Sequence, residues 1–82
     1  MTNHPHISRR SGVCGGEPII DGLRVTVRQV VMLHLRGETT PEIAEALDVT
    51  EAQVSHALSY FDGHRDEIFV LIAQENLAQE TP

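Results

Sequence analysis

Polar side chains that could read DNA bases gather in one short segment of this 82-residue chain. Gln can pair with adenine, Ser and Thr can contact several base edges, and Glu can accept from cytosine. The candidates between residues 50 and 59 are Thr50, Glu51, Gln53, Ser55, His56 and Ser59. Phosphate contacts would fall to Arg24 and Arg28, with Arg36 as a further candidate. These residue types predict a DNA-binding surface if a single helix presents them together.

The segment that would position these side chains, residues 40–61, has the apolar spacing of a helix-turn-helix. Thr40 is a suitable N-cap for the first helix, and Thr50 can cap the second. Asp48 lies at the turn, where a residue that tolerates the left-handed conformation is needed. The apolar faces would be formed by Ile43, Ala44 and Leu47 in the first helix and by Val54, Ala57 and Leu58 in the second.

Charge is distributed unevenly along the chain, which carries a formal net charge of −6 and no lysine. Residues 1–36 hold five arginines against two acids, whereas residues 37–82 hold one arginine against ten acids. Phosphate binding needs cations, so any nucleic-acid contact should use the N-terminal half. Two alternatives stay open: an uneven solvated surface, and a helix-turn-helix that binds only protein. Arg24 could also pair locally with Asp21 or Glu17.

The N-terminal third has strand-like pieces separated by turn signals. Gly15-Gly16 and Asp21-Gly22 mark turns, and the β-branched segment 23–27 alternates like a strand. Because two strands alone are marginal in water, this arm should pack on the helices or pair with a second subunit. A first helix should follow an N-cap at Thr26, reach about Arg36 and end at Gly37. Its buried stripe would comprise Val27, Val30, Val31, His34 and Leu35.

A final helix is expected from about residue 65 to residue 78, and it contains six consecutive apolar residues, 68–73. A helix that covers one side of a domain needs an apolar stripe of only about 100°. The excess predicts contact with a dimer mate or a partner protein; the alternative is a fully enclosed core helix. The candidate partner-binding residues are Ile68, Phe69, Val70, Leu71, Ile72 and Glu75.

These elements predict a mainly α fold with a short N-terminal β arm or hairpin, a tri-helical helix-turn-helix core and a C-terminal helix. Residues 1–26 would form the tail and arm, and residues 27–82 the helix-turn-helix region, within one structural domain overall. Enzymatic activity is not expected, because Cys14 has no partners at catalytic spacing. No cofactor or metal is expected either, although His4, His6 and Cys14 are ligands by type. Without a signal peptide or an apolar span, the expected location is the cytoplasm.

The arm and helices together resemble the domain-of-unknown-function family 433. The matching segments are CGGEPIIDGLRVTV, then a helix, GETTPEI, and AEALDVTEAQVSHALSYF. The resemblance covers about Ile7 to Ile68 and is most specific in the arm. The matching positions are Gly15, Gly16, Pro18, Ile20, Gly22, Arg24, Val27 and Tyr60. Leu23 stands where the family usually has Thr, which puts a hydroxyl role at that turn in doubt.

The resemblance implies a small antitoxin-like protein of a type II toxin–antitoxin pair. Such a protein neutralises a PIN-like ribonuclease toxin by direct binding and can repress its own operon through the helix-turn-helix. The implied partners are the toxin, operator DNA and a second copy of the chain in a homodimer or higher hetero-oligomer, with no membrane. The alternatives are a stand-alone dimeric DNA-binding regulator and a protein-only interaction module.

Overall fold

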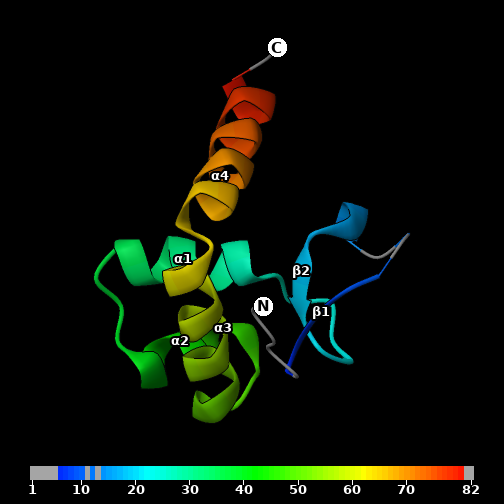
Figure 1. The fold of residues 1–82 in the computed structure, drawn as a ribbon. Coiled ribbons are helices and arrows are strands. Elements are labelled where there is room, and N and C mark those ends of the chain that lie inside the picture. The colour runs from blue at the N-terminus through cyan, green and yellow to red at the C-terminus, as the bar shows by residue number, and fades with distance from the viewer. Residues whose placement is uncertain (1–5, 11, 13, 81–82) are drawn as a thin grey trace.

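The computed structural model describes residues 6–10, 12 and 14–80, with side chains through Gln74. A two-stranded arm precedes four helices, so the expected mainly α fold is confirmed (Figure 1). The elements in chain order are β1 (Ile7–Arg9), η1 (Cys14–Gly16), β2 (Pro18–Ile20), α1 (Val27–Leu35), α2 (Thr40–Leu47), α3 (Glu51–Gly63) and α4 (Arg65–Glu80).

The arm is a short antiparallel pair that packs on the helices. Strand β1 pairs with β2 so that Ile7 lies opposite Ile20. The strand expected at 23–27 is wrong, because only one bridge joins Ile19 and Thr26 there. Thr26 is instead recruited to cap α1: its hydroxyl accepts from the Gln29 backbone N–H at 3.0 Å. The extended segment therefore ends at Thr26, because the side chain of this residue caps α1.

Helix α1 begins after Thr26 as predicted, and Val27, Val30 and Val31 are fully buried. The expected burial of His34 and Leu35 is wrong: both are exposed, Leu35 at 56%. They lie in the last turn of α1, on the part of the helix that extends past α3 and α4 (Figure 1).

Helices α2 and α3 form the predicted helix-turn-helix, with one shift at its start. The N-cap of α2 is Thr39 rather than Thr40. Thr39 places Glu42 at the third helical position, where the Glu42 carboxylate accepts the Thr39 backbone N–H at 2.7 Å. Asp48 adopts the predicted left-handed conformation, with φ 57°, and Thr50 caps α3 as predicted.

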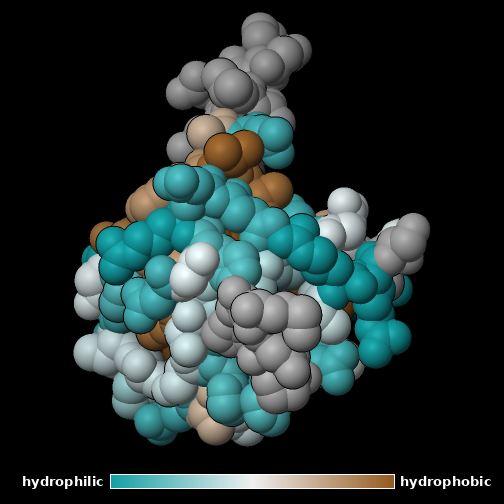
Figure 2. Space-filling model, viewed as in Figure 1, coloured by the Kyte–Doolittle hydropathy of each residue, from teal (hydrophilic) through white to brown (hydrophobic). Residues whose placement is uncertain are grey.

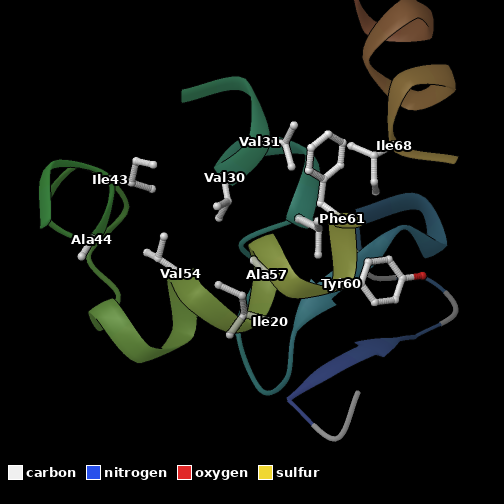
Figure 3. Close-up of a cluster of buried hydrophobic side chains, with 11 residues drawn as sticks. Ile20, Val30, Val31, Ile43, Ala44, Val54, Ala57, Tyr60, Phe61 and Ile68 are labelled. Atoms are coloured by element: carbon white, nitrogen blue, oxygen red, sulfur yellow. The ribbon is translucent and has the colours of Figure 1, made fainter. Parts of the chain in front are cut away.

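The core fills the space between α1, α2 and α3 and extends to the arm and the start of α4 (Figure 3). Val54 and Ala57 come from α3, Ile20 from the arm and Ile68 from α4. Full burial of an aliphatic or aromatic side chain contributes about 1.5–3 kcal/mol. The shared core therefore fixes the arm and the first turn of α4 against the helix-turn-helix.

Candidate functional site

The predicted base-reading residues divide into two groups on α3. Glu51, Ser55 and Ser59 are exposed on its outer side. Thr50 and Gln53 bind each other instead: the Thr50 hydroxyl accepts from the Gln53 backbone N–H at 3.0 Å, and the Gln53 amide oxygen accepts from the Thr50 N–H at 2.9 Å. Glu51, Ser55 and Ser59 can therefore contact a ligand freely. Thr50 and Gln53 could do so only if the N-terminal cap of α3 were broken.

His56, the sixth predicted base-reading residue, is partly buried beneath the arm. Its ring stacks on the ring of His6, with 3.8 Å between centroids and 19° between planes. The arm therefore covers part of the helix surface that was expected to face DNA.

The arginines predicted to contact phosphates differ sharply in exposure. Arg28 is tied to Glu17, with 3.0 Å between Nε and the carboxylate, and its side chain is only 15% exposed. Arg24 and Arg36 are exposed. The expectation that Arg24 pairs with Asp21 or Glu17 is wrong, because Arg10 pairs with Asp21 at 3.3 Å and Arg28 holds Glu17.

Arg9, Tyr60 and Glu67 form a polar cluster that sequence inspection missed. The Tyr60 hydroxyl donates to the Glu67 carboxylate at 2.8 Å and accepts from the Arg9 guanidinium at 3.0 Å. Arg9 also pairs directly with Glu67. The His64 ring stacks flat on Tyr60, with 3.9 Å between centroids. Positions up to 58 residues apart meet here, so no local spacing could have indicated the cluster.

Helix α4 presents apolar side chains to solvent. Phe69 is 46% exposed and Val70 is 55% exposed, which makes the alternative of a fully enclosed core helix wrong. Figure 2 shows hydrophobic side chains gathered along α4 above a largely hydrophilic face. Leu71 and Ile72 are half-buried against the core. Ile68 has no exposed surface, and the side chain of Glu75 lies outside the described residues.

Two open cavities adjoin the arm. The larger, of about 420 Å³, lies between η1 and α4 and is lined by Arg9, Gly15, Gly16, Glu17, Asp66, Glu67, Val70, Leu71 and Gln74. The smaller, of about 310 Å³, is lined by Arg10, Ile19, Gly22, Leu23 and Arg24. The Ser8 hydroxyl and the Arg10 guanidinium lower the pKa of Asp21 below the ordinary 3.8, so Asp21 is a carboxylate at neutral pH.

Residues 6–10, 12 and 14–80 contain no group of three or more His, Cys, Asp or Glu side chains arranged to hold a metal ion. Cys14, the one cysteine, directs its thiol to the Arg24 carbonyl at 3.4 Å. Within the same described ranges, no helix is both long and apolar enough to cross a membrane.

Comparison with known proteins identifies the family but not an activity. The search of curated proteins finds no match. A crystal structure of a DUF433 member protein from Anabaena variabilis is similar, with a TM-score of 0.76 and 28% sequence identity. That match covers 83% of this chain and 68% of the other. The model of the family described as "Protein of unknown function (DUF433)" matches residues 7–61, so this chain belongs to the DUF433 family.

Proposed function

We propose that this chain is the non-enzymatic antitoxin of a type II toxin–antitoxin pair, acting in the cytoplasm. Its α4 surface, defined here as Phe69, Val70, Leu71 and Ile72, would bind a PIN-like ribonuclease toxin. The observation that carries the proposal is the roughly half-exposed state of Phe69 and Val70 on one helix. Apolar residues rimmed by charged ones are typical of protein-binding sites.

The electrostatics of the C-terminal half support the same partner. Residues 37–82 carry ten acids against one arginine. A ribonuclease binds a polyanionic substrate with basic groups, and acidic side chains beside an apolar contact could occupy those groups. Asp66 and Glu67 lie next to Val70 in the wall of the larger cavity. The α4 surface therefore combines an apolar contact area with a negatively charged rim, which suits the basic groups of a ribonuclease.

Co-expression with a PIN-like protein encoded beside this gene tests the proposal, with growth rescue and co-purification as readouts. We expect Val70→Asp to abolish rescue and to weaken binding at least tenfold, because it places a charge in the desolvated centre of the contact. Leu35→Asp is the matched control, since Leu35 has an equivalent exposure of 56% on a different helix. Circular dichroism establishes that both variants are folded. Rescue by Val70→Asp equal to wild type would exclude α4 as the toxin-binding element.

Sequence-specific DNA binding, as a stand-alone dimeric regulator or as a repressor of the same operon, is the second candidate function. It is favoured by the helix-turn-helix geometry and by the open side chains of Glu51, Ser55 and Ser59. The absence of lysine and arginine from α3 opposes it. Binding to a palindromic upstream site at physiological salt, lost in Ser55→Ala/Ser59→Ala, would establish this function. Toxin binding without any such DNA complex would leave a protein-only module.

A further inference from the structure

The smaller cavity, called the arm cavity below, is lined by two arginine side chains that are not held in buried ion pairs. Arg10 and Arg24 line it together with Ile19, Gly22 and Leu23. Arg24 is exposed and forms no ion pair with any residue that the structure describes. Arg10 pairs only with Asp21, and both side chains are exposed, at 60% and 48%. Such an exposed pair is weak and is readily exchanged for a stronger anion.

The rest of the cavity wall suits a small anion with an attached organic group. Gly22 has φ +81°, and a Cβ placed there would meet no atom within 4 Å, so a ligand can approach its backbone. Ile19 is buried and Leu23 is half-buried, so the cavity that the two arginines line also has apolar wall residues. Arginine forks match the oxygens of phosphates and carboxylates two at a time, and of these two groups a phosphate can accept from two arginines at once with three oxygens.

The remaining arginines near the arm are engaged in structural contacts. Arg9 binds Tyr60 and Glu67, and Arg28 binds Glu17 with a side chain that is largely buried. Helix α3 carries no lysine or arginine. Among the described residues of the arm, Arg10 and Arg24 are therefore the pair that can accept an external anion.

We propose that the arm cavity binds a phosphate group between Arg10 and Arg24, with Asp21 as the internal carboxylate that the phosphate displaces from Arg10. The phosphate belongs either to a nucleic-acid backbone or to a free phosphate ester. If it belongs to DNA, the arm holds the backbone and α3 does not. This inference does not depend on the toxin contact of α4, and its test uses the chain alone.

The test titrates the full-length chain with inorganic phosphate, followed by amide chemical shifts, and with a labelled duplex of random sequence, followed by anisotropy. We expect Arg24→Gln to weaken whichever probe binds about tenfold, since it removes a charge-assisted contact. Arg65→Gln is the matched control because Arg65 is exposed at the start of α4 and its loss changes the net charge equally. We expect that control to stay within about twofold of wild type.

Substitution of the competing carboxylate gives a result of opposite sign. Asp21→Asn frees Arg10, so we expect it to tighten phosphate binding several-fold. Asp66→Asn makes the same charge change on exposed α4 and should have little effect. Binding of inorganic phosphate alone would assign the cavity to free phosphate esters, and binding of the duplex would assign it to a backbone. The proposal fails if neither probe binds, or if Arg24→Gln and Arg65→Gln cause equal losses.

Discussion

The burial of apolar side chains differs between two parts of this molecule. In the family-matched segment, residues 7–61, Val30, Ile43 and Val54 have no exposed surface. Among the residues of this segment that the structure describes, Leu35 is the one large apolar residue that is strongly exposed. In α4, beyond that segment, Phe69 and Val70 are about half exposed within a single turn. The first part uses its apolar residues to fold, whereas α4 has a surplus that its own domain does not cover.

Polar side chains show the same contrast. In the matched segment, threonine side chains cap three successive helices, and Arg28 and Glu17 neutralise each other at 3.0 Å. In α4, Glu67 is drawn into the body through Tyr60 and Arg9, whereas the pair between Arg65 and Asp62, at 3.3 Å, is exposed and weak. The difference shows that residues 7–61 supply most of the fold, and it supports the proposal that α4 binds a partner.

The largest expected effect separates the two parts by stability. Ile43→Ala should lower the free energy of unfolding by about 2–5 kcal/mol, because it leaves a cavity in the core. Val70→Ala, a substitution on the exposed surface of α4, should change it by less than about 0.5 kcal/mol. Urea denaturation followed by circular dichroism measures both. Similar losses from the two substitutions would mean that α4 is as much a part of the core as α2.

A smaller effect is expected where the two parts are joined. Tyr60→Phe removes the hydroxyl that bridges Arg9 and Glu67, and we expect a loss of about 1 kcal/mol of unfolding free energy. The neighbouring exposed Ser59→Ala should stay within about 0.5 kcal/mol of wild type. Hydrogen exchange should also become faster in the first turn of α4 in Tyr60→Phe. Unchanged exchange there would show that the apolar contacts of α4 hold the helix without the Tyr60 hydroxyl.

Asp48 tests whether the matched segment stores backbone strain at its turn. Asp48 has φ 57°, a conformation that glycine adopts without steric cost. We therefore expect Asp48→Gly to raise the free energy of unfolding by up to about 1 kcal/mol, and Asp48→Ala to lower it. Thermal unfolding of the two variants measures the difference. A fall in stability for Asp48→Gly would assign the carboxylate a role that outweighs its backbone cost.

The smallest effect concerns the cap of α2 at low pH. The backbone and hydroxyl of Thr39 bind the Glu42 carboxylate and lower its pKa below the ordinary 4.5. A carboxyl whose pKa is lowered by folding stabilises the native state above its unfolded pKa, and this contribution is lost as pH falls through the folded pKa. Carbon-13 NMR should therefore place the Glu42 midpoint below 4.5, and Thr39→Pro, which removes the backbone donor, should return it towards that value. An unshifted midpoint in wild type would contradict the cap.

Much of the local structure could be predicted because it depends on neighbours in the chain. Thr26 and Thr50 were predicted as caps because each precedes a segment with helical apolar spacing, and Asp48 was placed at the turn from its tolerance of the left-handed conformation. Thr40 was wrong by one position because only Thr39 places a glutamate where it completes a reciprocal cap. Such errors are small since the competing choices are adjacent.

The candidate sites were less predictable, because burial and pairing depend on distant segments. Helical spacing placed His34 beside Val27 and Val31 on one face, but α1 extends past its neighbours before reaching it. Proximity in sequence suggested that Arg24 pairs with Asp21, whereas the arm brings Arg10 there instead. Each outcome required knowing which elements lie side by side.

Sequence alone therefore determined the order of the arm and the four helices, the caps at Thr26 and Thr50, and the surplus of apolar residues in the last helix, since these follow from local hydrogen bonding and composition. Tertiary structure decided how that surplus is divided: Ile68 enters the core, while Phe69 and Val70 remain exposed. It also decided that Arg28 forms a largely buried ion pair with Glu17, and that Arg10 and Arg24 line the arm cavity. These assignments come from packing between elements, which the order of residues along the chain does not contain.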